Sequence, residues 1–363
     1  MNKQAIVNNT LTLGIPNFSY ADLYDPIKLK ELLAVFDETV KQDDAALFSR
    51  YLDYRNTQGN NISPEEISQI LVEMGPHLGH FVAKLFGIEQ DRSTQKQSIQ
   101  DEFDAVFTFR SEIVEKAAKK YKKETISEED AKRLQKGIDL LVAATSPMGT
   151  SDREFAISNV GADIARLTLH YAALKKEKPS DYPAAAKIEQ LRQALTSHTD
   201  AGQCFSEIIN LNDSAEFVDG LYNWLGRWAH AAQQDANLKT AHKGWMIFKG
   251  PEKTDFNDLV PVETKQISNY SALVGPKDTR RRRDGFALTD PRFNERESLY
   301  EVDHCIYCHE RDTDSCSKGI RNKKDGSFKT NPLDVTLTGC PLEEKISEMH
   351  WLNGKGTTSA RWH

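Results

Sequence analysis

Apolar residues recur at helical spacing through most of the first 240 residues of the chain. An early stripe consists of Leu29, Leu32, Leu33, Phe36 and Val40. Side chains three and four positions apart share one face of a helix, so this pattern predicts amphipathic helices that bury their apolar faces against one another. Helix-start signals precede the stripes, as in Asp25-Pro26 and Ser63-Pro64. We therefore expect a mainly α protein whose residues 1–240 form an N-terminal helical bundle.

One of the stripes is interrupted by the pair Gly75-Pro76. Apolar residues at helical spacing lie on both sides of the pair, from Ile67 to Met74 and from Leu78 to Leu85. A proline inside a helix lacks the N–H that bonds to the preceding turn, and its ring clashes with that turn. The sequence therefore predicts two helices that are separated at Gly75-Pro76.

The pattern changes after about residue 240. Short apolar runs, Trp245–Phe248 and Leu259–Val262, lie on either side of Gly250-Pro251. Prolines, glycines and charged residues dominate the positions up to 300. This composition predicts an irregular linker over residues 241–300, in which the two apolar runs can pair as a short β-hairpin. Residues 301–363 then form a third segment, and most of the cysteines lie there.

Composition and charge narrow the class of protein. The 363 residues carry a formal net charge of −7, which argues against general nucleic-acid binding. The N-terminal residues Met1-Asn2-Lys3-Gln4 lead into no apolar signal region, and aliphatic runs such as Leu140 to Ala144 are too short to span a membrane. We therefore expect a cytoplasmic protein without a membrane span. In that reducing compartment, clustered cysteines are metal ligands or redox groups more often than disulfides.

Four of the five cysteines lie close together near the end of the chain. They are Cys305, Cys308, Cys316 and Cys340, and the gaps between them are two, seven and 23 residues. Thiolates are soft ligands that suit iron–sulfur clusters and zinc, and ferredoxin ligand sets also end in Cys-Pro. The spacing predicts that these four residues are the metal ligands of one [4Fe-4S] cluster. The fifth, Cys204, lies within a helical pattern and is expected to be a small core residue.

The residues after Cys340 favour a helix. Pro341 suits the first position of a helix, and the pattern from Leu342 to Trp351 is helical. Cys340 is then expected at the N-cap, where free backbone N–H groups and the positive end of the helix dipole stabilise an anionic cluster.

Two other metal centres fit part of the same pattern. A zinc site with four cysteine ligands is one alternative, although zinc ribbons usually have a second Cys-x2-Cys pair and this chain has none. The stretch Cys305-Ile306-Tyr307-Cys308-His309 also matches the Cys-x2-Cys-His motif of c-type haem attachment. That reading leaves Cys316 and Cys340 without a role, and haem attachment generally needs export.

Nucleotide-binding and hydrolase motifs are missing from the sequence. There is no Gly-x-Gly-x-x-Gly after a strand, no P-loop and no Gly-x-Ser-x-Gly. We assign no catalytic residue and expect no dinucleotide-binding unit of the Rossmann type within the chain.

Three stretches together resemble a known family. They are residues 303–311 (DHCIYCHER), residues 314–319 (DSCSKG) and residues 339–342 (GCPL). They resemble the N-terminal iron–sulfur region of glutamate synthase small-chain-like oxidoreductases, which are FAD-dependent flavoproteins of the pyridine nucleotide-disulfide type. The resemblance covers residues 285–356, about a fifth of the chain.

The resemblance implies a small α-helical, ferredoxin-like module that transfers electrons. Its [4Fe-4S] cluster would exchange them with an FAD that reacts with NAD(P)H. Family members continue into two nucleotide-binding domains, whereas this chain stops at His363. FAD and NAD(P)H are therefore expected only through a missing continuation or a flavin-bearing partner subunit, and the chain alone is not expected to be active. The rival hypothesis is a zinc-stabilised protein-interaction module without redox activity.

Overall fold

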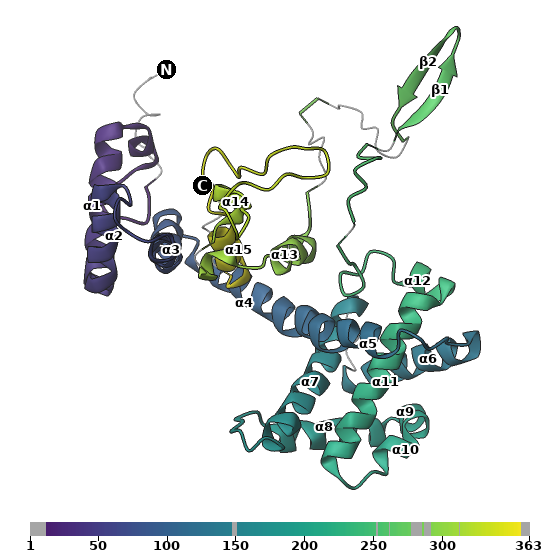
Figure 1. Cartoon of the computed structure of the whole chain (residues 1–363). Helices are drawn as coiled ribbons and strands as arrows, with labels where there is room; N and C mark the ends of the chain where they lie inside the picture. Colours follow the sequence, from purple (N-terminus) through teal and green to yellow (C-terminus); the bar gives the residue numbers. More distant parts are fainter. Residues whose placement is uncertain are drawn as a thin grey trace, which may run out of the picture. The chain divides into compact units, whose positions relative to one another are not determined.

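The computed structural model describes residues 12–146, 151–251, 253–260, 262–276, 285–286, 292–311 and 313–356, and these residues are mainly helical (Figure 1). The expectation of a mainly α protein is therefore confirmed. Contacts between residues divide the chain into two compact units. Unit 1 contains the described residues up to Ser93 together with those from Gly250 onwards, and unit 2 contains Thr94–Lys249.

These units follow a different division from the predicted segments 1–240, 241–300 and 301–363. The predicted boundaries rest on changes in composition along the chain, whereas the units rest on packing between distant residues. Helix α3 near the start of the chain contacts helix α15 near its end, which places both in unit 1. The three-segment domain assignment itself stays a prediction.

Unit 1 begins with an N-terminal group of helices. Its helices and strands are η1 (Tyr20–Tyr24), α1 (Pro26–Asp43), α2 (Ala45–Thr57), α3 (Pro64–Phe86), β1 (Glu263–Ile267), β2 (Tyr270–Val274), α13 (Glu295–Asp303), η5 (Cys308–Arg311), α14 (Ser315–Lys318) and α15 (Ile346–Gly354). The N-cap signals predicted at Asp25 and Ser63 are confirmed, since these side chains accept hydrogen bonds from the N–H groups of Ile27 and Glu66.

The N-terminal helices share one apolar core. Their buried side chains are Ile15, Phe18, Leu32, Phe36, Val40, Leu47, Ile70, Met74, Phe81 and Leu85. The extended residues before α1 join this core because the N–H of Gly14 donates to the carbonyl oxygen of Leu85 at 2.8 Å. A side chain at Gly14 would collide with the backbone of Lys84. Among the described residues, the side chains that form this core all lie between Leu13 and Leu85.

The predicted break at Gly75-Pro76 is wrong. Helix α3 continues through both residues from Pro64 to Phe86, with Pro76 inside it. The helical hydrogen-bond pattern continues on both sides of the proline. The apolar face of the helix is buried before and after it, at Met74 and Phe81. Packing of that face therefore outweighs the single hydrogen bond that the proline removes.

A hairpin does occur in the linker region, but the predicted runs do not form it. Strands β1 and β2 pair antiparallel, with Ile267 opposite Tyr270. The two residues between them, Ser268 and Asn269, make the turn, and Ser268 has a positive φ of 56°. The run Trp245–Phe248 instead forms turns in unit 2, since Phe248 N–H donates to the carbonyl oxygen of Trp245.

In the described residues of unit 2, helices are joined by turns and loops, and there is no strand. The helices are α4 (Glu89–Glu102), in which the boundary between the units falls, the π-helical segments η2 (Phe103–Phe107) and η3 (Arg110–Val114), α5 (Glu115–Lys120), α6 (Glu128–Thr145), α7 (Arg153–Leu174), α8 (Ala184–Ser197), α9 (Thr199–Cys204), α10 (Ser206–Ile209), α11 (Ser214–Gln234) and α12 (Ala236–Ala241). Helix α11 contacts α5, α6 and α7, so it runs through the centre of the unit.

Aromatic rings fill the middle of unit 2. Trp228 of α11 is fully buried, and its indole stacks on the ring of Phe109 with centroids 6.3 Å apart. The indole N–H donates to the side-chain oxygen of Gln135 at 2.9 Å, so the buried polar atom is satisfied. Helix α7 approaches Phe109 through Gly161, whose missing side chain leaves room for the ring.

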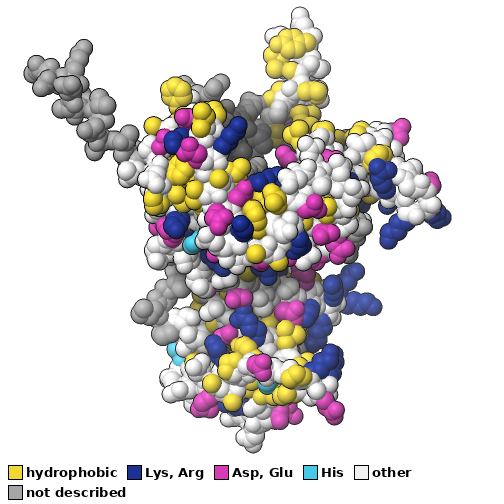
Figure 2. All heavy atoms as spheres, turned by 90° about the vertical axis from the view of Figure 1, so that its left-hand side faces the viewer, with side chains coloured by type: hydrophobic (Ala, Val, Ile, Leu, Met, Phe, Trp, Pro, Cys, Tyr) yellow, Lys and Arg dark blue, Asp and Glu magenta, His cyan; other side chains and the backbone are white. Residues whose placement is uncertain are grey.

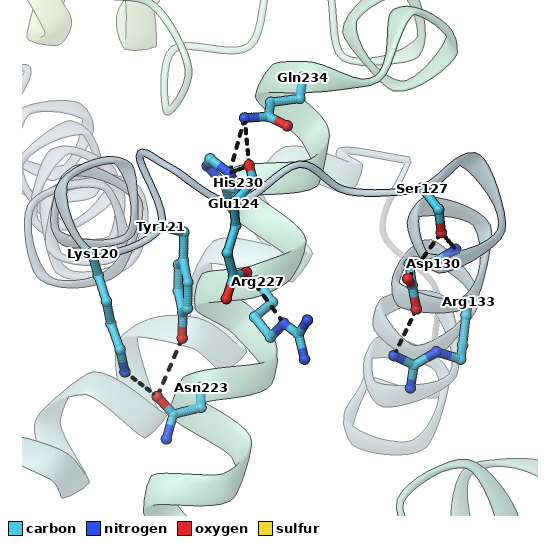
Figure 3. Close-up of polar contacts among 10 residues, drawn as sticks. All are labelled: Lys120, Tyr121, Glu124, Ser127, Asp130, Arg133, Asn223, Arg227, His230 and Gln234. Carbon is cyan, nitrogen blue, oxygen red and sulfur yellow. Dashed lines mark hydrogen bonds and ion pairs between the residues drawn. The ribbon is translucent and has the colours of Figure 1, made fainter.

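The loop between α5 and α6 is fastened to α11 by polar contacts (Figure 3). The carbonyl oxygen of Glu124 lies 3.0 Å from Nε2 of His230 and 3.1 Å from the amide nitrogen of Gln234. At the start of the loop, the side-chain oxygen of Asn223 accepts from Lys120 at 2.6 Å. These bonds hold the exposed loop against α11 at both of its ends.

No helix among the described residues combines the length and the apolar character needed to cross a membrane. Figure 2 shows hydrophobic side chains among charged ones on the face of the molecule that it displays. Exposed apolar residues near and in α1 include Tyr24 and Ile27, at 82% and 69% exposure. Scattered exposed apolar residues are normal on protein surfaces, and these carry no function by themselves.

Candidate functional site

The four predicted ligands lie in one part of unit 1, which we call the cysteine module: the described residues between Glu295 and Gly356. Helix α15 is its centre, because it contacts α13, η5 and α14 (Figure 1). It also contacts α3 of the N-terminal helices. The module therefore packs on the N-terminal core of the same unit.

The first two cysteines follow helix α13. A capping box formed by Asn294 and Glu297 begins this helix, and the N–H of Cys305 donates to the carbonyl oxygen of Val302 at its end. Tyr307 has a positive φ of 46°, which turns the chain between the two cysteines. Cys308 then begins the 3-10 helix η5 and is buried.

Ser347 of α15 links this segment to the centre of the module. Its hydroxyl lies 2.5 Å from Nδ1 of His309 and 3.9 Å from Sγ of Cys305. Ser347 is fully buried and His309 is almost so. Because a buried hydroxyl without a partner is costly, this contact fixes the Cys-x2-Cys-His segment against α15.

The last two cysteines are joined through their backbones. The N–H of Cys340 donates to the carbonyl oxygen of Cys316 at 2.8 Å. Gly319 and Gly339 make this approach possible: a Cβ at Gly319 would lie 2.4 Å from the carbonyl oxygen of Leu337, and one at Gly339 would lie 2.4 Å from the Gly319 nitrogen. Both glycines also have positive φ values, of 80° and 86°.

The chain between Cys316 and Cys340 is a folded loop. Ile320 N–H donates to the carbonyl oxygen of Leu337 at 3.0 Å, and Leu337 N–H donates to that of Lys329 at 2.9 Å. Short antiparallel bridges join Arg321 to Phe328 and Thr330 to Thr336. The two ends of this loop therefore meet, and Cys316 and Cys340 become neighbours although they are distant in sequence.

Asp314 holds the short helix that carries Cys316. Its carboxylate accepts from both the N–H and the hydroxyl of Ser317, and from Nζ of Lys345 at 2.9 Å. Burial acts to raise the pKa of Asp314, but the hydrogen bonds from Ser317 and Lys345 outweigh it and lower the pKa below 3.8. Asp314 is therefore a charged N-cap that ties α14 to the residue preceding α15.

Cys340 does not cap a helix, so that prediction is wrong. Helix α15 begins only at Ile346, and the N–H of Glu343 donates to the carbonyl oxygen of Cys340 at 3.0 Å in a tight turn. Glu343 has a positive φ of 52°, which an α-helix cannot contain. A helix dipole therefore does not act on the thiol of Cys340.

The thiols of the module interact electrostatically. Partial burial raises the pKa of Cys316, and the neighbouring Cys308, Asp314, Cys305 and Glu348 add to the rise because each disfavours a second negative charge nearby. Cys316 is therefore protonated at neutral pH.

The residues fit a metal centre in chemistry more than in geometry. All five cysteines are free of disulfides, and four of them lie in one module. Among the described residues, however, no three His, Cys, Asp or Glu side chains lie close enough together to hold a metal ion. Cys204 belongs to unit 2 and is only partly buried, so it is not one of the buried core residues that the sequence predicted it to join; burial raises the pKa of its thiol.

Sequence reasoning missed the residues that position the cysteines. Asp314 carries a readable signal, since an Asp three residues before Ser317 is a common N-cap pattern. Gly319 and Gly339 each lie close to a cysteine in the sequence, which is a weaker signal. Nothing in the sequence marks Ser347 as the partner of His309, because that contact depends on how α15 packs.

Comparison with known proteins gives two matches. A family model described as the RP005 N-terminal alpha-helical domain matches residues 13–87, which is the segment that closes the N-terminal core. The chain is also 26% identical over 349 residues to a protein of Rickettsia prowazekii (strain Madrid E) described as uncharacterized protein RP005. That similarity covers 93% of this chain and 97% of the relative. No solved structure matches the chain.

The resemblance to glutamate synthase small-chain-like flavoproteins is wrong. Neither match belongs to an iron–sulfur or glutamate synthase family. The resemblance rested on a few residues around cysteines, and short cysteine patterns recur in unrelated metal-binding and redox proteins. A similarity that spans nearly the whole chain outweighs such local matches.

Proposed function

We propose that the cysteine module binds an iron–sulfur cluster through Cys305, Cys308, Cys316 and Cys340 and serves in electron transfer. The observation that carries the proposal is the backbone hydrogen bond of 2.8 Å that joins Cys316 to Cys340 across the folded loop between them. Helix α15 contacts both η5, which carries Cys308, and α14, which carries Cys316. Four thiols thus come from one small module, as a four-thiolate cluster requires.

A cluster suits the module better than a single ion does. A zinc ion needs its four ligands at about 2.0–2.3 Å from one centre, so their sulfur atoms must crowd around a point. In a [4Fe-4S] cluster each thiolate binds a different iron, so the ligands surround a larger body. The pair Cys305-x2-Cys308 and the final Cys340-Pro341 are also typical of ferredoxin ligand sets, and they favour the cluster.

The chain's own residues would hold the module in shape around the cluster. Ser347 fixes the segment with Cys305 and His309, and the ion pair of Asp314 with Lys345 fixes the turn with Cys316. When bound, the cluster would supply one-electron transfer. A one-electron carrier needs a redox partner, so the proposed partner is a redox protein or subunit, and the proposed location is the reducing cytoplasm, where thiols remain available.

The proposal is tested by purifying the full chain anaerobically and measuring iron, acid-labile sulfide and zinc per chain. We expect iron and sulfide in similar amounts and a broad visible absorbance that dithionite bleaches. A colourless protein with stoichiometric zinc would replace electron transfer with a zinc-stabilised interaction module. A protein that binds neither iron nor zinc, even after anaerobic reconstitution with iron and sulfide, would contradict both the iron–sulfur and the zinc hypothesis.

A further inference from the structure

Unit 2 contains a pocket of a different character from the cysteine module. Its volume is about 490 Å³, and it lies where α11 ends, beside α12 and the turns that follow. Pockets of about 300–1,000 Å³ are typical of small-molecule sites. All the residues that line it belong to unit 2, so the pocket is complete within one body. We call it the Trp245 pocket.

Aromatic rings form one wall of the Trp245 pocket. The rings of Trp245 and Phe248 are nearly parallel, at an angle of 6° with centroids 6.3 Å apart. The imidazole of His242 packs on Trp245 with centroids 4.3 Å apart. Trp245 and Phe248 are only partly buried, so each keeps ring surface that a planar group can cover.

Lysines supply the charge of the pocket. Lys239, Lys243 and Lys249 line it, and none of the described residues lining it is acidic. All three side chains are exposed to solvent. Ammonium groups bind phosphate oxygens as point charges, and three of them in one place favour a multiply charged anion.

His242 adds a polar group to the apolar wall. The residue is 5% exposed, and its Nδ1 has no hydrogen-bond partner. Burial, together with the charge of Arg153, lowers the pKa of His242 to about 4. The ring is therefore neutral at neutral pH, and it leaves the aromatic wall uncharged.

We propose that the Trp245 pocket binds a nucleoside phosphate, with the base against the Trp245 and Phe248 rings and the phosphates at the lysines. An aromatic face joined to a cluster of cations matches the two ends of such a ligand. Base stacking on an aromatic ring tolerates any base, so the wall alone sets no preference among bases. The site is separate from the proposed cluster, and either proposal can fail without the other.

The test is calorimetric titration of the full chain with ADP, adenosine and inorganic phosphate. We expect ADP to bind and the two fragments to bind at least about tenfold more weakly, since each makes only part of the contacts. Trp245→Ala and the pair Lys239→Glu with Lys243→Glu should each weaken ADP binding by about tenfold or more. Trp245→Phe, which keeps an aromatic ring, should retain most of it.

Lys119→Glu is the matched control for charge, because Lys119 is an exposed lysine of α5 outside the pocket. It should leave ADP binding unchanged, and circular dichroism should show that each variant remains helical. No heat of ADP binding at millimolar concentration would overturn the proposal. So would ADP binding that all the pocket variants keep, or binding of a single-stranded oligonucleotide without binding of ADP.

Discussion

Gly75 of α3 lies directly against the side chain of Leu352 of α15. A Cβ at position 75 would stand 2.7 Å and 2.8 Å from the two terminal carbons of Leu352, closer than such atoms approach. The same two helices meet at Ser68 and Glu348, which are hydrogen-bonded and buried. The N-terminal core and the cysteine module therefore pack closely at Gly75, where any larger residue would require Leu352 to move.

Gly75→Val should loosen the contact between α3 and α15. The added side chain overlaps Leu352, and overpacking of this kind costs about 1–3 kcal/mol. Hydrogen exchange followed by mass spectrometry should show faster exchange in α15, with a smaller change in α1. Leu352→Ala combined with Gly75→Val should restore part of the protection. Gly250→Val is the control, since no atom lies within 4 Å of a Cβ there.

Gly161→Ala should destabilise unit 2. A Cβ at position 161 would lie 2.2 Å and 2.4 Å from two ring carbons of Phe109, and Phe109 has no exposed surface into which it can move. The clash should exceed the gain in helix propensity of about 1 kcal/mol, giving a net loss of about 1–3 kcal/mol. Urea unfolding followed by tryptophan fluorescence measures the loss. Adding Phe109→Leu should reduce it, and equal stability of Gly161→Ala and wild type would contradict the packing described.

Unit 2 should lose stability as the pH falls from about 6.5 towards 4. The pKa of His242 is lowered to about 4 by burial, from an ordinary value of 6.5. Between these values the unfolded chain binds a proton that the folded chain does not, so acid favours unfolding; above 6.5 this contribution is fully present. Thermal unfolding followed across that range should show a smaller loss in His242→Gln. An identical pH slope in both proteins would sink this explanation.

The helical spacing of apolar residues predicted the helices of unit 2 and of the N-terminal core well, because these helices are held in place mainly by burial of their apolar faces. The stripe from Leu29 to Val40 became α1, whose buried residues are Leu32, Phe36 and Val40. The pattern failed at Pro76, where burial on both sides of the proline overrode a local breaker. The rule that proline breaks a helix concerns one residue and does not include the packing energy of a helix of 23 residues.

The cysteine module was predicted less completely, for a physical reason. Spacing singled out four thiols, whose role as ligands stays a prediction, but Cys316 meets Cys340 through the fold of the chain between them. The glycines and the Asp314 cap that allow this meeting act through backbone geometry, and cysteine spacing carries no information about it. The helix expected from Leu342 begins only at Ile346, because Glu343 adopts a left-handed conformation in a turn.

Serine at each of the four module cysteines should lower iron and sulfide content per chain, because a hydroxyl is a harder and poorer ligand for iron than a thiolate. Cys316→Ser and Cys340→Ser should act alike, since their backbones are joined at 2.8 Å. Cys204→Ser is the control: it removes a thiol from unit 2, where burial raises the pKa, and should leave the metal content unchanged. Metal analysis after anaerobic reconstitution decides the matter. Loss of iron in Cys204→Ser with retention in Cys316→Ser would show that the ligands are assigned wrongly.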